Sequence, residues 1–394
     1  MTKRPSQLLF ILFAILMSAM PAGAGEPDDF AGRADREAPI ANEAINAVLN
    51  VLLDEALADA NASKSSCSVE VLKRRMFYAF DRNFPEFLGA LRHTAYKYIA
   101  GPREPDASAL KPYVSKHRFM WTETFKVKTK SGEHMIGLDK IDHFFGHGYL
   151  NWIAGAGGTT ANQNEILKLN HDQESGPWGL KTTNVKSYAD LSANHLGVSF
   201  WKNLVDGPEP HVVCKNGKFV LSRKFDLFKY LDASVDETIN CSSFASAESL
   251  TGFLAHAKNM NSTCPVSKST CQALTKSRPG NLGVLTLHPL CRGLKHDQLE
   301  VPTPHTVEDI LTKASGLLSG GENLIPFWFN RNNGGEMKTK AGAIHKIPDP
   351  PPRQVSSGPL MQATVEVAPP GWKIDVEAKE APLHQDTEKS RTAK

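Results

Sequence analysis

Six cysteines that follow an apolar leader constrain this chain more than any other feature of its sequence. An even number of cysteines in an oxidising compartment is typical of structural disulfides, so we expect three bridges. The sequence leaves the pairing open, although the short interval between Cys264 and Cys271 favours a small closed loop between these two. No pair has the CxxC spacing of a redox site or a zinc ribbon. The cysteines are Cys67, Cys214, Cys241, Cys264, Cys271 and Cys291.

The leader occupies residues 1–24 and has the three parts of a secretory signal peptide. Lys3 and Arg4 form its charged start, an apolar run follows, and small residues that end at Ala24 form a cleavage site. The apolar run is shorter than the roughly 20 residues that span a bilayer, and no later stretch reaches that length. We therefore expect a periplasmic or secreted protein with no transmembrane helix in the mature chain.

Composition allows a sizeable core and excludes one class of partner. The chain has 394 residues, 41% of them hydrophobic, which is enough for two ordinary domains or one large one with appendages. Its net charge is +3, and the mature chain is closer to neutral because Lys3 and Arg4 lie in the leader. This balance argues against nucleic acid as a partner and against broad binding to anionic membranes. Neither a nucleotide-binding fingerprint nor a Gly-x-Ser-x-Gly elbow is present.

Helical periodicity dominates the first half of the chain. Asn42 is a candidate N-cap, and the apolar positions after it repeat at helical spacing. Two more helices are predicted at about 138–154 and 184–206, with a Gly, Asn and Thr rich connection between them. Val212 to Leu221 places Asn-Gly between two β-favouring runs, which predicts a two-stranded hairpin.

These patterns predict a mainly α protein. A helical domain is followed by a small α+β, disulfide-stabilised region that contains the hairpin, and the expected edge between them lies near Asp206. A bridge from Cys67 to a later cysteine would merge the two parts into one folded unit. The expected segments are a signal peptide (1–24), a flexible lead-in (25–41), the helical domain (42–206), the cysteine-containing region (207–345) and a Pro-rich, charged, disordered tail (346–394).

The segment from Gly137 to Tyr149 carries the most chemistry. On a helix, Asp139, His143 and His147 fall at i, i+4 and i+8 and form one stripe of a carboxylate and two imidazoles. Such a stripe offers three metal ligands or an acid-base relay. Zinc helices use the HxxxH spacing, but Phe144 replaces the glutamate that a metalloprotease needs as general base.

The second helix carries a matching polar stripe. Asp190 and Asn194 share one face, while Ala193 and Gly197 form a small-residue track that lets another helix approach closely. If the two helices pack together, Asp190 could accept a hydrogen bond from His143 or complete a metal shell. Asn194 could satisfy a neighbouring polar group.

The two stripes together resemble a known pattern. Asp-Lys-x-x-His-Phe followed by Asp-x-x-Ala-Asn-x-x-Gly is similar to the motifs of an uncharacterised family of small bacterial periplasmic lipoproteins, and more loosely to VanZ-like membrane proteins. The likeness covers about residues 137–205, whereas those relatives are smaller and more hydrophobic and have no counterpart to the cysteine-bearing flanks. It implies an envelope location and a shared polar helix pair, without a reaction. The matching positions are Asp139, Lys140, His143, Phe144, Asp190, Ala193, Asn194 and Gly197.

Three interpretations of this polar set stay open at the sequence level. The first is a buried, mutually satisfied network that fixes helix register. The second is a site for a divalent metal such as zinc, with Asp139, His143, His147 and Asp190 as ligands. The third is a metal-free acid-base site, for which Asp139, His143 and Asp190 are the catalytic candidates. Lys140, Asn194 and Gly197 would support any of these.

Two functions follow from these interpretations. One is an exported envelope protein whose polar helix pair is structural or binds a small ligand. The alternative is a metal-dependent hydrolase acting on an envelope lipid or glycan. An open cleft would favour the enzyme, and a closed helix interface would favour the first function.

Overall fold

The computed structural model describes residues 39–63, 66–77, 79–80, 124–155, 160–176, 179–252, 264–295, 298–299, 302, 337–338 and 344–345. The predicted signal peptide, most of the lead-in and the Pro-rich tail lie outside these residues.

Helix α2 (Asn42–Asn61) forms where the apolar period predicts it. Its inward face consists of buried aliphatic side chains such as Ile45, Leu49 and Leu53. The expected N-cap is wrong, because Asn42 is the first helical residue and makes no cap. Its amide instead donates to the carbonyl oxygen of Lys128 at 2.7 Å and accepts from the backbone N–H of the same residue at 2.9 Å. Asn42 therefore ties the start of α2 to the hairpin described next.

Two short antiparallel hairpins are present, and the second confirms the hairpin that the sequence predicts at Val212 to Leu221. Strands β1 (Thr124–Thr129) and β2 (Gly132–Gly137) form the first, which leads directly into the motif helix. Strands β4 (Val212–Lys215) and β5 (Lys218–Leu221) form the second. The intervening Asn216 and Gly217 have φ angles of 51° and 74°, as a tight turn between twisted strands requires.

The motif segment is one continuous helical run with a wide turn at its centre. It consists of α5 (Asp139–Asp142), the π-helical turn η6 (His143–His147) and α6 (Gly148–Gly155). π-Helical turns are rare and occur frequently at functional sites. Both predicted ligands of the HxxxH motif, His143 and His147, lie within this turn.

The connection after this run contains structure that the sequence analysis missed. Residues Thr160–Glu174 form helix α7, followed by the short α8 (Leu180–Thr183). Strand β3 (Val185–Ser187) then precedes helix α9 (Tyr188–Asn203), so the predicted helix at 184–206 begins a few residues later than expected. The sequence does not predict helix α7, because most of its residues are polar and its apolar residues do not repeat at a clear helical spacing. Its buried aliphatic residues are Ile166, Leu167 and Leu169.

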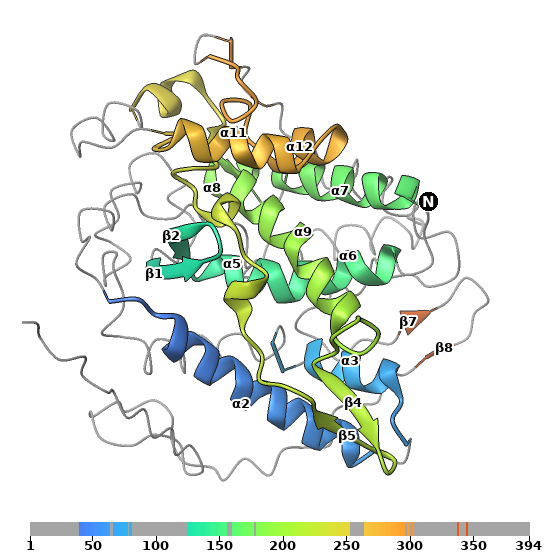
Figure 1. Ribbon diagram of the computed structural model, residues 1–394. Helices are drawn as coiled ribbons and strands as arrows, with labels where there is room; N and C mark the ends of the chain where they lie inside the picture. The colour runs from blue at the N-terminus through green and yellow to red at the C-terminus, as the bar shows by residue number, and fades with distance from the viewer. Residues whose placement is uncertain are drawn as a thin grey trace, which may run out of the picture. The chain divides into compact units, whose positions relative to one another are not determined.

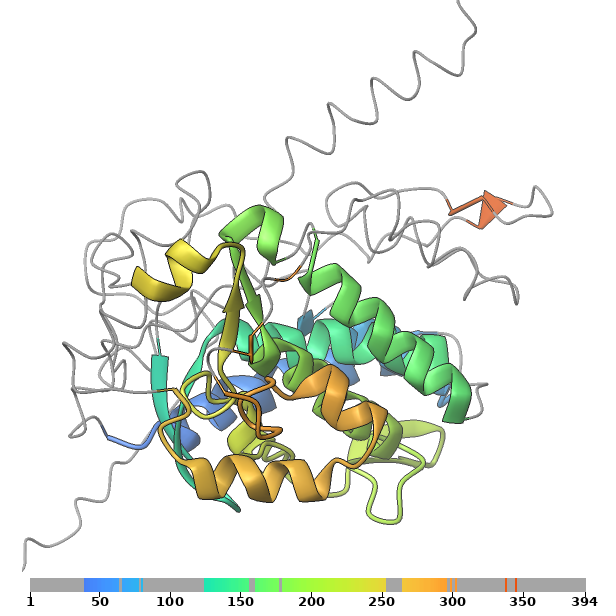
Figure 2. The same ribbon diagram turned by 90° about the horizontal axis from the view of Figure 1, so that it is seen from above.

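Helix α9 is the central element of the described fold. It packs against α6 and η6 on one side and against α7 and α12 on another (Figure 1). Helices α11 (Lys268–Ser277) and α12 (Asn281–Thr286) follow each other, and α12 also contacts α7 (Figure 2). The remaining described elements include α3 (Val69–Phe77), which packs against α2, η7 (Leu227–Lys229), η8 (Ala233–Val235), β6 (Ser242–Phe244), which pairs with β3, a helical segment at 247–252, and the pair β7 (Met337–Lys338) and β8 (Ile344–His345).

An aromatic and aliphatic core joins the first helices to the second hairpin. Phe145 lies at its centre, 4.1 Å from the ring of Phe80 and 5.3 Å from that of Phe200 between centroids. Trp201 donates its indole N–H to the carbonyl oxygen of Phe145 at 2.9 Å. Burial of these large rings is the main favourable contribution to folding here. The fold is therefore mainly α with small antiparallel strand pairs, as predicted.

The three expected disulfides form, but not with the expected short loop. Cys67 is joined to Cys214, Cys241 to Cys264, and Cys271 to Cys291. The expected small loop between Cys264 and Cys271 is wrong. Cys271 lies on α11 and is bonded to Cys291 in the turn after α12. The bridge between Cys67 and Cys214 joins residues on both sides of the predicted domain edge near Asp206. The position of that edge stays a prediction.

Disulfides of this kind indicate an extracytoplasmic environment. None of the helices within the described ranges combines the length and apolar character that a bilayer crossing requires.

Candidate functional site

The site forms where the motif helix lies against the start of α9. Ser187 is the N-cap of α9, and its hydroxyl accepts from the backbone N–H of Asp190 at 3.1 Å. This local cap fixes Asp190 at the first turn of α9, facing α5 and η6. Gly197 allows the close approach, since a Cβ added there would lie 1.9 Å from the carbonyl oxygen of Phe144.

Three predicted side chains converge at this contact. Asp139, His143 and Asp190 each offer one ligand atom, and these atoms all lie within 4.8 Å of one another. The Nε2 atom of His143 is 3.4 Å from Oδ2 of Asp190. All three side chains are at most 7% exposed. The structure thus brings together a set of two carboxylates and one imidazole that the sequence singled out.

His147 occupies a different place in the same turn. Its ring stacks on that of His143, with 4.7 Å between centroids and 13° between planes. It does not belong to the convergent set of Asp139, His143 and Asp190 that the described residues form. His147 therefore lies beside His143 along the helical run, as its i+4 spacing predicts, but outside this set of ligand atoms.

Asn194 orients the imidazole from the other side. One atom of its amide group lies 2.8 Å from Nδ1 of His143. With its nitrogen turned toward the ring, the amide also donates to the carbonyl oxygens of His143 and Asp190, at 3.3 and 3.2 Å. In that orientation Nδ1 accepts, so the ring proton lies on Nε2 and points to Asp190. The amide and the carboxylate together fix the tautomer of His143.

Lys140 lies at the centre of the acidic groups. Its ammonium nitrogen is 2.7 Å from Asp139, 2.7 Å from Asp190 and 2.9 Å from Glu237, and its side chain is fully buried. Glu133, an acidic residue nearby in the sequence, pairs with Lys126 instead, at 2.9 Å. Lys140 therefore links the motif helix, α9 and the segment after η8.

Glu237 is a site residue that the sequence analysis missed. Its carboxylate accepts from Lys140, from the hydroxyl of Ser187 at 2.7 Å and from that of Ser242 at 3.2 Å. It comes from a loop without helical or strand periodicity, about 50 residues beyond the second motif, so no spacing pointed to it. The capping signature of Ser187 followed three residues later by Asp190 was visible in the sequence and could have placed Ser187 in the site.

Burial dominates the electrostatics of the cluster. Loss of hydration raises the pKa of Asp139, Asp190 and Glu237, and the Lys140 ammonium partly offsets this effect. For Asp190 the resulting pKa is about 6. Three carboxyl groups thus share one buried ammonium, and the cluster favours an additional positive charge or a proton.

Comparison of the chain with protein-family models, with curated proteins and with solved structures finds no match.

Proposed function

We propose that this chain is an exported protein of the bacterial cell envelope that binds a divalent metal ion through Asp139, His143 and Asp190. The observation that carries the proposal is the convergence of these three ligand atoms within 4.8 Å. Two carboxylates and an imidazole are ligands that zinc, manganese and iron accept in proteins. The resemblance of the motifs to periplasmic lipoproteins and the leader support the envelope location.

The charge of the cluster also supports a cation. The carboxyl groups of Asp139, Asp190 and Glu237 outnumber the single ammonium of Lys140, and burial makes this excess unfavourable. A divalent ion would stabilise the ionised carboxylates. Its binding requires deprotonated ligands, so the affinity should increase with pH.

A closed structural network is the second candidate, and one observation favours it. The Lys140 ammonium already contacts all three carboxylates, as a register-fixing network requires. The burial of the three ligand residues also favours ion binding or a structural role over hydrolysis of an envelope lipid or glycan, which needs access for the substrate.

Metal loading separates the two candidates. The mature chain would be produced in an oxidising compartment, stripped with a chelator and titrated with zinc and with manganese by calorimetry. We expect saturable binding near one ion per chain, and a loss of affinity of at least about tenfold in Asp190→Asn and in His143→Gln, because each removes one ligand. Thermal unfolding with and without metal would report the same loss.

The matched control is His211→Gln. His211 is also buried, but it bonds to the hydroxyl of Tyr230 at 2.6 Å, away from the cluster. This variant should bind metal like the unaltered protein. A protein that takes up no metal at any pH between 6 and 9, while Asp190→Asn loses stability, would leave the structural network as the correct interpretation.

A further inference from the structure

The ammonium group of Lys140 lies between two carboxylates of the candidate metal site. Its nitrogen is 2.7 Å from Oδ2 of Asp139 and 2.7 Å from Oδ1 of Asp190. No part of the Lys140 side chain is exposed, so its charge depends on these contacts rather than on water. A metal ion bound to the same two carboxylates would have to take over contacts that the ammonium now makes.

The distances do not allow both cations to keep these contacts. The three ligand atoms of Asp139, His143 and Asp190 lie within 4.8 Å of one another. Zinc binds carboxylate oxygens at about 2.0–2.2 Å, so an ion among these atoms would lie next to the Lys140 ammonium. Like charges at such a separation repel strongly in a buried site, where little water screens them. Metal binding therefore requires the ammonium to leave its present position.

Glu237 supplies a position to which the ammonium can move. Its Oε1 atom already lies 2.9 Å from the Lys140 nitrogen, and its carboxylate is fully buried. Glu237 does not belong to the convergent ligand set that the described residues form, so a metal ion leaves it available. The hydroxyls of Ser187 and Ser242 donate to it at 2.7 and 3.2 Å and hold it in place. A short movement along an existing contact is therefore enough.

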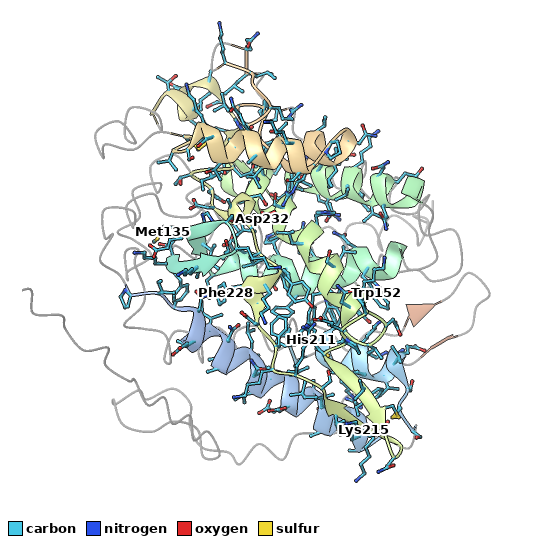
Figure 3. The ribbon with its side chains drawn as sticks, viewed as in Figure 1. Met135, Trp152, His211, Lys215, Phe228 and Asp232 are labelled. Carbon is cyan, nitrogen blue, oxygen red and sulfur yellow. A yellow bond between two sulfur atoms is a disulfide. The ribbon has the colours of Figure 1, made fainter. Side chains whose placement is uncertain are left out.

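The loop that carries Glu237 is fixed to two other parts of the fold. The neighbouring Asp236 accepts a hydrogen bond from the backbone N–H of Met135 on β2 at 3.0 Å, and Met135 is labelled in Figure 3. A disulfide joins Cys241, four residues beyond Glu237, to Cys264. Glu237 therefore stays in place, whereas the long and flexible lysine side chain can change its direction.

We propose that Lys140 and a divalent metal ion compete for Asp139 and Asp190. Metal binding moves the ammonium away from both aspartates, and Glu237 remains as its partner. This inference rests on the proposed metal site and describes the regulation of that site: the ammonium stabilises the acidic cluster in the metal-free protein, and the ion replaces it. A divalent ion carries twice the charge of the ammonium and gains more at the two carboxylates, whereas a monovalent ion offers no such gain. The exchange therefore favours divalent ions.

Removal of the ammonium tests the competition directly. The full mature chain and its Lys140→Met variant would be stripped with a chelator and titrated with zinc and with manganese by calorimetry. Lys140→Met keeps a side chain of similar length without the charge, so it should bind each ion at least about tenfold more tightly. Thermal unfolding without metal shows whether the variant is folded. Equal or weaker binding by a folded Lys140→Met would overturn the proposal, and a purely structural role of Lys140 predicts no gain in affinity.

Glu237→Gln is a second test, which stays valid if Lys140→Met fails to fold. Glutamine has the shape of glutamate and can still accept from the two serine hydroxyls, but it lacks the charge that holds the displaced ammonium. Metal affinity should therefore fall at least about fivefold. Unchanged affinity would contradict the exchange. When Lys140→Met is also present, Glu237→Gln should cost much less, because no ammonium remains to be held; equal losses with and without Lys140 would show a general charge effect and exclude the exchange.

The matched control is Lys73→Met. Lys73 is 2% exposed, but it pairs with Asp206 at 3.5 Å and lies 3.7 Å from the centre of the Trp152 ring, which is labelled in Figure 3. This variant removes the same charge from another buried position, outside the acidic cluster, so its affinity for zinc should not change. Equal gains in Lys73→Met and Lys140→Met would show an effect of net charge alone and would contradict the proposal.

Comparison with the unaltered protein separates this inference from the proposed function. Metal binding by the unaltered protein without a gain in Lys140→Met would exclude the competition and leave the metal site intact. Binding by Lys140→Met alone would support the competition and overturn metal binding by the natural chain, because the ammonium would then hold the site permanently. Absence of binding by both proteins would overturn both proposals.

Discussion

At the scale of single residues, Lys186 makes the free energy of unfolding depend on pH. Burial is the main cause that lowers its pKa from 10.5 to about 7, with Arg292 adding to the effect. Between these two values the unfolded chain holds a proton on Lys186 that the folded chain has lost. The free energy of unfolding should therefore rise with pH across this window, by at most about 1.4 kcal/mol per pH unit.

Lys186→Met should remove this slope. Urea unfolding between pH 7 and 9.5 would show a flatter curve for the variant, and the comparison is free of thiol chemistry because all six cysteines are in bridges. The control Lys295→Met, which removes an exposed lysine, keeps the slope of the unaltered protein. An unchanged slope in Lys186→Met would mean that the lysine stays charged in the folded state.

At the scale of elements, the contact of α9 with the motif helix depends on the absence of a side chain at Gly197. In Gly197→Ala the new Cβ would meet the carbonyl oxygen of Phe144 at 1.9 Å and Cα of Gly148 at 3.0 Å. Since both are backbone atoms, the helices must separate, at a cost of about 3 kcal/mol. Denaturant unfolding measures this loss, and Ser199→Ala, on the exposed face of α9, should change stability little. Equal stability of both variants would show that the helices adjust without loss.

Much of this arrangement could be predicted from sequence because it follows local periods. The inward face of α2, the Asn-Gly hairpin and the polar stripe of the motif helix all repeat at short spacing. Asp139, His143 and Asp190 could be chosen because a helix brings i and i+4 together. Glu237 could not be predicted as a site residue, because only the tertiary fold brings its loop next to Lys140. His147 does follow His143 at the predicted spacing, but the spacing alone does not show which of the two imidazoles meets Asp190.

At the scale of the whole molecule, the disulfides differ in how much chain they constrain. Cys67 and Cys214 are 147 residues apart, whereas Cys271 and Cys291 are 20 apart. Because a bridge across a longer loop removes more entropy from the unfolded chain, the first should contribute about 5 kcal/mol and the second about 3 kcal/mol.

Paired replacements test this difference. Cys67→Ala with Cys214→Ala should lower the urea midpoint more than Cys271→Ala with Cys291→Ala. The reverse order would mean that the native contacts of α11 with the turn at Cys291, rather than chain entropy, determine the loss.

The longest bridge also makes the polypeptide a closed covalent ring between residues 67 and 214. A protease that cuts this ring once leaves both pieces attached, so the nicked protein migrates as a single species on a denaturing gel until reductant is added. Two bands that appear only after reduction would locate a cleavage inside one of the three bridged loops, and two bands without reduction would locate it outside all of them. In an extracytoplasmic environment, where proteases are frequent, one cut within this ring does not release a fragment.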